Sequence, residues 1–144
     1  MIGEKIIYEF DNFTGLMPVE EFKKVFTYNF KLHWRSKDRI KPYIQKEKVG
    51  CYLIYNNNKE VIYVGKSSNC IRLRLIHHLF TNNAITVKYG ERLEINYANK
   101  TKKLRIEAKY FSYTEIDKTD LSFVEVGLIN KYKPKFNIKD NDSL

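Results

Sequence analysis

The pattern of apolar positions divides the chain into segments with helical spacing and short runs that are continuously apolar. The first helical segment begins at residues 17–21, where a proline and two glutamates occupy positions typical of a first helical turn. Apolar residues then recur at helical spacing: Phe22, Val25, Phe26 and Phe30. This pattern predicts a helix that ends near His33 or Trp34 and docks an apolar face on the core or on a second subunit.

Two β-prone runs follow in the middle of the chain, at residues 51–55 and 61–64. Three consecutive asparagines lie between them, and asparagine tolerates the positive φ that tight turns require. Gly65 closes the second run. Two apolar runs joined by such a turn predict an antiparallel hairpin.

The remaining sequence predicts a helix, a strand and a final helix. A polar residue among 67–69 is expected to cap the helix after the hairpin, and the alternating pattern of residues 104–113 predicts a strand. Thr119 or Asp120 is expected to cap a last helix that runs to about Tyr132 and stops before Pro134. Residues 82–103 fit either an additional β pair or an irregular excursion.

The element order from Gly50 predicts the fold class. It reads β-β-α, an insert at about 82–103, then β-α, which predicts an α/β (α+β) fold with a small, mostly antiparallel three-stranded sheet flanked by helices. We expect residues 1–49 to form an N-terminal extension, a helix plus a basic linker, and residues 50–144 to form the main domain. A chain of 144 residues suffices for one such core.

The charge of the chain favours a polyanionic partner. The formal net charge is +9 and the sequence pI is about 9.4. Residues 61–109 hold ten lysines or arginines and three acids, so most of the excess lies in one stretch, as a phosphate-facing surface requires. The two cysteines are too few for a four-thiolate zinc site, and no apolar run is long enough to cross a membrane. We therefore expect a soluble, cytoplasmic protein.

Five polar side chains are expected to converge. Because strand side chains alternate between faces, the hairpin can place Tyr52 and Tyr63 side by side on one face. Arg74 and His78 are four residues apart and share one face of the next helix. Glu125 lies among the apolar residues of 123–129, where a carboxylate either points to solvent or is held for a purpose.

These residues resemble a known signature. Gly50-Cys51-Tyr52 and Tyr63-Val64-Gly65 resemble the two halves of the motif that defines the GIY-YIG nuclease family, and Lys66 follows the second half as in many members. The run Ile71-Arg72-Leu73-Arg74 with His78 resembles the family helix, and residues 125–137 resemble the family's closing segment with its glutamate and terminal asparagine. The resemblance covers about residues 50–138.

The resemblance implies a catalytic domain that cleaves phosphodiester bonds with one metal ion. Glu125 would bind Mg²⁺ or Mn²⁺, and Mg²⁺ commonly uses few protein ligands. Tyr52 is the candidate base that takes the proton from water, with Lys66 and the metal lowering its pKa, and His78 is the rival base or the group that orients Tyr52. Tyr63 would position the water or the phosphate. Asn137 is expected to tie the tail to the site.

The catalytic arginine has two candidates. The family spacing from the second tyrosine to the arginine is one residue shorter than the spacing to Arg74, and strict counting arrives at Leu73. Either a one-residue insertion precedes Arg74, or Arg72 has taken the role. We favour Arg74, because it alone keeps a four-residue step to His78, and because guanidinium grips phosphate in a fork geometry.

Basic residues outside this group are candidates for nucleic-acid contacts. The expected set is Lys66, Arg72, Arg74, Lys100, Lys102, Lys103 and Arg105. The basic residues of 31–41 either contact the DNA backbone or form a solvated linker. The insert is where a stand-alone member might read sequence or shape.

Several functions share this chemistry. A stand-alone DNA endonuclease of restriction, phage or mobile-element type is the first hypothesis, and a restriction enzyme that cuts both strands would need a homodimer or a larger assembly. A DNA-repair incision nuclease, an RNA-directed nuclease and a non-catalytic nucleic-acid-binding module are the alternatives. Retention of a metal carboxylate speaks against the last.

Overall fold

The computed structural model describes residues 13–33, 35–41, 44, 48–79 and 102–138. Its elements are β1 (Met17–Pro18), α2 (Val19–Phe30), β2 (Gly50–Tyr55), β3 (Val61–Ser67), α3 (Ile71–Leu79), α6 (Lys102–Glu107), β4 (Tyr110–Glu115), the 3₁₀ turn η1 (Lys118–Asp120), α7 (Leu121–Tyr132) and α8 (Lys135–Ile138). Within the described residues, no helix is both long and apolar enough to span a bilayer.

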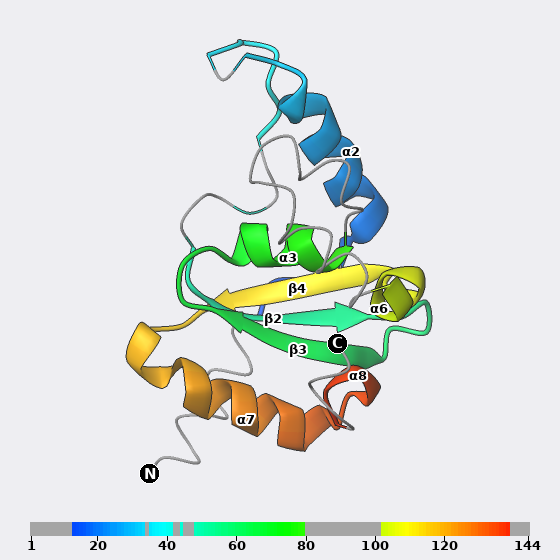
Figure 1. The fold of residues 1–144 in the computed structure, drawn as a ribbon, viewed down its shortest axis with the longest axis vertical. Coiled ribbons are helices and arrows are strands. Elements are labelled where there is room, and N and C mark those ends of the chain that lie inside the picture. The colour runs from blue at the N-terminus through cyan, green and yellow to red at the C-terminus, as the bar shows by residue number, and fades with distance from the viewer. Residues whose placement is uncertain (1–12, 34, 42–43, 45–47, 80–101, 139–144) are drawn as a thin grey trace.

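One antiparallel sheet organises the fold. Its strand order is β1-β4-β2-β3, with β2 paired to both β3 and β4 (Figure 1). The helix α3 covers one face of this sheet, and α7 covers the other. The predicted α/β architecture is confirmed, with one difference: the two-residue strand β1 extends the expected three strands to four.

Alternation along β2 supplies both halves of the core. Tyr52 and Ile54 point to the α3 side and join a cluster that includes residues of α2 and α3. Cys51 and Leu53 point to the opposite side and pack with residues of α7, among them Leu128. A strand that is apolar on both faces needs a layer of helices on each side, and the chain supplies both layers.

The predicted hairpin and its flanking elements are present. Asn56 orders the turn, because its side-chain oxygen accepts hydrogen bonds from the backbone N–H groups of Asn58 and Glu60, each at 3.0 Å. Ser67 accepts the backbone N–H of Cys70 at 2.9 Å just before α3 begins. The helix α7 ends at Tyr132 as expected.

The strand predicted at residues 104–113 is partly wrong. Its first half is the helix α6, and the strand β4 begins only at Tyr110. Leu104 and Ala108 are buried and four residues apart, and the N–H of Ala108 donates to the carbonyl of Leu104 at 2.9 Å. In a strand Ile106 would share the face of Leu104, but it is 66 % exposed. A short apolar–polar alternation is compatible with either a strand or a helix. Here the segment is helical, because the helix buries Leu104 and Ala108 together.

The N-terminal helix docks on the main core. Val19 and Phe22 of α2 are buried, and the Phe22 ring lies 5.0 Å from that of Phe111 on β4. The helix ends at Phe30, a turn earlier than expected. The side chain of Phe30, the residue Trp34 and most of the predicted insert at 82–103 lie outside the described residues.

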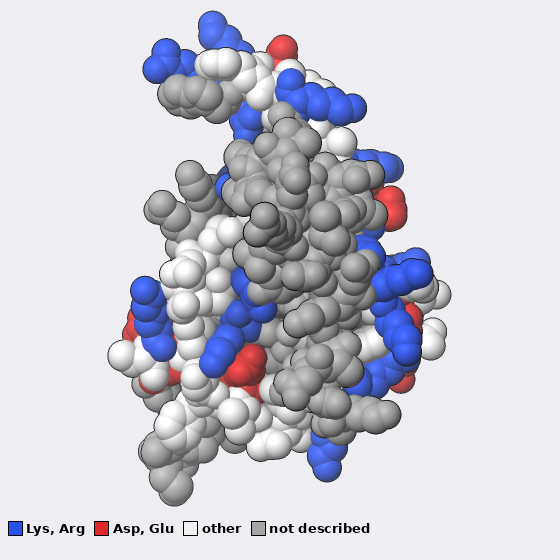
Figure 2. Space-filling model, in the orientation of Figure 1, with Lys and Arg blue, Asp and Glu red and all other residues white. Residues whose placement is uncertain are grey.

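Exposed cations gather in two places on the visible face. Lysine and arginine side chains cluster over the end of α2 with the loop that follows it, and along the side of the molecule that carries α6 (Figure 2).

The division of the chain into an extension over residues 1–49 and a domain over residues 50–144 stays a prediction.

Gly50→Ala is expected to destabilise the fold by about 1–3 kcal/mol, the usual range for overpacking a core. A Cβ at this position would overlap the backbone carbonyl oxygen of Thr114 on β4, which the strand pairing holds in place. Urea denaturation followed by circular dichroism measures the change. Gly15→Ala is the matched control, because open space surrounds Gly15; equal stability of the two variants would contradict the expectation.

Candidate active site

Three aromatic rings meet on the α3 face of the sheet. The ring of Tyr52 on β2 lies 6.2 Å from that of Tyr63 on β3 and 6.0 Å from that of His78 on α3. The rings of Tyr63 and His78 are 4.9 Å apart. All three side chains are buried. The hairpin and the helix after it thus bring the two tyrosines and the histidine together.

Gly65 makes room for Tyr52. The two residues are directly opposite each other in the β2–β3 ladder. A Cβ on Gly65 would overlap the end of the Tyr52 ring, including its hydroxyl oxygen. The hydroxyl therefore lies against the main chain of β3 at Gly65.

Arg74 is the arginine that reaches this cluster. Burial, above all, holds the pKa of Tyr52 well above its ordinary value, and the neighbouring Tyr63 raises it further. The guanidinium of Arg74 acts in the opposite direction by its charge and a polar contact. That contact is loose, because the Tyr52 hydroxyl makes no hydrogen bond of regular geometry to any described residue.

Glu125 approaches from the opposite side of the sheet edge. It lies on α7, its side chain is 23 % exposed, and its Oε1 is 3.6 Å from Nζ of Lys66 on β3. Lys66 also donates to the Ser122 hydroxyl at 2.9 Å. The Glu125 carboxylate is close enough to raise the pKa of Tyr52. The charge of Glu125 therefore acts on Tyr52 although the two side chains belong to elements on opposite faces of the sheet.

Asn137 joins the C-terminal helix to the edge strand. Its side-chain oxygen accepts the backbone N–H of Val64 at 2.7 Å, and its Nδ2 donates to the carbonyl of the same residue at 2.8 Å. This pair of bonds satisfies main-chain groups that an edge strand leaves unpaired. It also fixes α8 beside the strand that carries Tyr63 and Lys66.

The donors around Glu125 fit a single hard cation. The described residues contain no group of three or more histidine, cysteine, aspartate or glutamate side chains suited to a metal. Burial, followed by the negative charge of Glu125, raises the pKa of the nearby Cys51 thiol to about 12, so this thiol stays protonated. One carboxylate suits Mg²⁺ or Mn²⁺, which keep waters and substrate oxygens as their other ligands.

The other expected basic residues that the structure describes lie on α6 and α3. Lys102, Lys103 and Arg105 are on α6, which packs against α3, and burial lowers the pKa of Arg105. Arg72 is half-exposed on α3. Lys100 lies outside the described residues.

Sequence reasoning missed Ser122 and the role of Gly65. Ser122 precedes Glu125 by three residues, so both share a face of α7, and this spacing was the available signal. Gly65 leaves space for the Tyr52 ring because the β2–β3 register places the two residues opposite each other, and the sequence alone does not specify this register.

The chain matches the family model for the UvrC-like GIY-YIG domain over residues 48–138. Among curated proteins it is 35 % identical over 96 residues to UvrABC system protein C of Mycoplasma capricolum, an alignment that covers 66 % of this chain and 14 % of that protein. The protein of the same name from Rickettsia akari is 31 % identical over 100 residues, covering 67 % and 13 %. The chain thus spans about a seventh of the length of these relatives.

Among solved structures, the GIY-YIG N-terminal endonuclease domain of UvrC from Thermotoga maritima is similar, in a point mutant bound to its catalytic divalent cation. The identity is 22 %, the TM-score is 0.46, and the match covers 65 % of this chain and 87 % of that domain. The family match spans well over half of the residues and contains every group of the site described above. The resemblance that the two tyrosine motifs indicated is therefore confirmed: this chain belongs to the family of UvrC-like GIY-YIG domains.

Proposed function

We propose that this chain is a metal-dependent DNA endonuclease that hydrolyses phosphodiester bonds with a single divalent cation held by Glu125. One observation carries the proposal: the rings of Tyr63 and His78 lie beside that of Tyr52, and the charges of Arg74 and Glu125 act on its phenol. Pure nucleic-acid binding requires cations, but it does not require an acidic group beside a buried phenol. This favours catalysis over a binding-only module.

The charged groups have complementary tasks. Cleavage of a phosphodiester develops negative charge on the non-bridging and leaving oxygens. In this proposal Arg74 holds the phosphate by a forked pair of hydrogen bonds. The cation at Glu125, Mg²⁺ or Mn²⁺, supplies Lewis-acid stabilisation of the same charge when bound.

Tyr52 is the proposed base for the attacking water. In the ion-free protein its pKa is raised, so the phenol is neutral at physiological pH. Two nearby charges tune this value in opposite directions: Arg74 lowers it and the carboxylate of Glu125 raises it. Neutralising Glu125 therefore lowers the pKa of Tyr52 and moves it towards a useful base. The ring of His78 lies 6.0 Å from that of Tyr52, and His78 is either the rival base or the group that orients Tyr52.

The similar proteins change which biological role is favoured. The sequence alone favours a restriction or phage-type role, with repair incision as the alternative. The similarity to UvrABC system protein C favours the incision alternative. Such a role does not require the two active sites of a homodimer, whereas a restriction enzyme that cuts both strands does.

Glu125→Gln is expected to reduce nicking of supercoiled plasmid by roughly a thousandfold or more, as a loss of several kcal/mol of charge stabilisation implies. DNA binding in EDTA should be unchanged or slightly stronger, because one negative charge is lost. Glu115→Gln is the matched control, because Glu115 is an exposed acid on β4 that pairs with Lys48. Wild-type turnover by the Glu125 variant would remove the metal role; no nicking by the wild type with Mg²⁺ or Mn²⁺ would favour the binding-only module.

Arg74→Ala is expected to lower the cleavage rate constant by about 10²–10³, the usual effect of removing one donor to developing charge. Arg72→Ala, which removes the same charge from the same helix, should cost less than tenfold. Single-turnover cleavage at saturating protein separates this step from binding. A larger loss in the Arg72 variant would show that Arg72 carries the role.

The pKa of Tyr52 is expected to fall in Glu125→Gln and to rise in Arg74→Gln, relative to the ion-free wild type. The carboxylate disfavours the phenolate and the guanidinium favours it, so removal of each charge has the opposite sign. NMR titration of ¹³C-labelled tyrosine rings measures the values, with Tyr52→Phe assigning the resonance. Movement of the pKa in the same direction in both variants would contradict this arrangement.

A further inference from the structure

We propose that a lysine-lined groove at the hairpin-turn end of the sheet binds the phosphate backbone of the DNA beside the cut. The proposal rests on the proposed nuclease function and names a second contact region for the same substrate. The groove is defined by Lys59, Lys103, Lys133 and Lys135. Three of these lysines, at positions 59, 133 and 135, were absent from the nucleic-acid-binding residues that the sequence suggested.

Two hollows that share Lys135 make up the groove. The larger, about 570 Å³, has Tyr55 and Tyr132 among its lining residues, with Lys59 and Lys133 at its sides. The smaller, about 360 Å³, lies between α6 and α8 and includes Lys103. The groove therefore collects lysines from the hairpin turn, α6, the end of α7 and α8.

Two of these lysines, Lys59 and Lys133, have a backbone conformation that is unfavourable for lysine. Lys59 has φ 63° and Lys133 has φ 46°, and they are the residues other than glycine with positive φ in the described chain. This conformation favours glycine or asparagine, and a lysine there costs free energy. Three asparagines directly precede Lys59 in the turn, yet the left-handed position holds the lysine. Both strained lysines line the same hollow, which points to a use for their charge.

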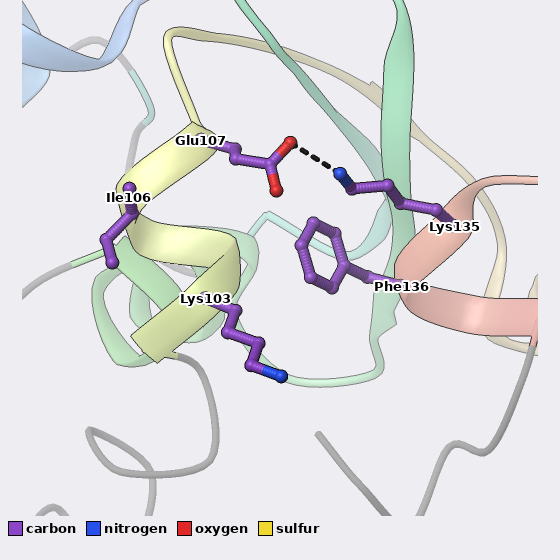
Figure 3. A pocket seen from close by; sticks show the side chains of 5 residues that line it. All are labelled: Lys103, Ile106, Glu107, Lys135 and Phe136. Atoms are coloured by element: carbon purple, nitrogen blue, oxygen red, sulfur yellow. Dashed lines mark ion pairs between the residues drawn. The ribbon is translucent and has the colours of Figure 1, made fainter.

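An ion pair holds the third lysine at the junction of the hollows. Nζ of Lys135 lies 2.7 Å from Oε1 of Glu107, and the two side chains point towards each other from α8 and α6 (Figure 3). The same ammonium is 5.2 Å from the centre of the Phe136 ring. Glu107 thus orients Lys135 and also neutralises part of its charge. Glu107 lines the smaller hollow, whereas the acid that lines the larger one is Glu60, which accepts a hydrogen bond from the side chain of Asn56 at 2.8 Å.

The groove lies within reach of the candidate active site along two elements. Val61 and Ile62 line the larger hollow, and Tyr63 is the next residue of the same strand. On α7, Tyr132 is seven residues beyond Glu125, a rise of about 10 Å along the helix. That length corresponds to about three base pairs of duplex rise. A duplex held at the catalytic cluster can therefore extend to these lysines.

The chemistry of the groove fits phosphate rather than bases. Lysine ammonium groups act as point charges that neutralise phosphates in any sequence. Each phosphate neutralised releases counterions, so binding weakens in proportion as salt rises. The groove should consequently strengthen binding and fix the path of the duplex without adding sequence preference.

The test is the salt dependence of DNA binding by the double variant Lys59→Gly, Lys133→Gly. Glycine suits both backbone conformations, so the variant loses two charges without strain and its thermal midpoint should not fall. Fluorescence anisotropy with a duplex in EDTA, where no cleavage occurs, should give a log–log salt slope shallower by about two than that of the wild type. Lys24→Ala is the control, since it removes a charge from the exposed face of α2; its slope should match the wild type.

Glu107→Gln is an independent variant that should change DNA affinity in the opposite direction. It removes the acid that neutralises Lys135 and should tighten binding, with a steeper salt slope. The proposal that the groove binds DNA would be overturned if the double glycine variant had the same salt slope as Lys24→Ala. It would also be overturned if the wild type showed no salt-dependent binding. Failure of the wild type to nick plasmid with Mg²⁺ would remove the nuclease proposal instead, and the binding slopes would still decide the groove.

Discussion

The pairing of Tyr52 with Gly65 in the β2–β3 ladder determines where the groups of the candidate active site lie. A glycine on the edge strand leaves space for a phenol that has no room elsewhere, because every other side of the ring is buried. The carboxylate of Glu125, on the helix that covers the other face of the sheet, still acts on this phenol through its charge. A shift of one residue in this register would turn Tyr52 to the α7 face and separate it from Tyr63 and His78.

Edge-strand protection and site assembly use the same contacts in this fold. The strand β3 is at the edge of the sheet and carries Tyr63, Gly65 and Lys66. Asn137 satisfies its main-chain groups at Val64 from one side, and Lys66 binds α7 through Ser122 and Glu125. The interactions that block unwanted strand addition therefore also hold the groups of the candidate active site in place, which explains why a site can form on an edge strand.

Local patterns identified most elements, and tertiary contacts decided the rest. The hairpin was predictable because two apolar runs and an asparagine turn agree with each other. Residues 104–107 were not, because Leu104 and Ala108 satisfy a helical period only once α3 is present to bury them. The choice of Arg74 over Arg72 followed from its spacing to His78, and the structure places its charge beside Tyr52. The Lys66–Ser122 bond and the left-handed lysines depend on three-dimensional contacts and backbone angles that no single-sequence pattern encodes.

The charge balance at Glu125 has a consequence for how the proposed nuclease is regulated by its substrate. Lys66 pairs with Glu125, so in the proposed mechanism a divalent cation would compete with an ammonium for this carboxylate. One shared carboxylate binds such a cation weakly, since Mg²⁺ then relies on waters for its remaining ligands. In that mechanism a phosphate held by Arg74 would supply both further oxygen ligands for the cation and a negative charge for Lys66. Metal affinity and DNA affinity should therefore increase together, by the reciprocity that governs any two linked binding sites, and the free protein should hold little metal until DNA is bound.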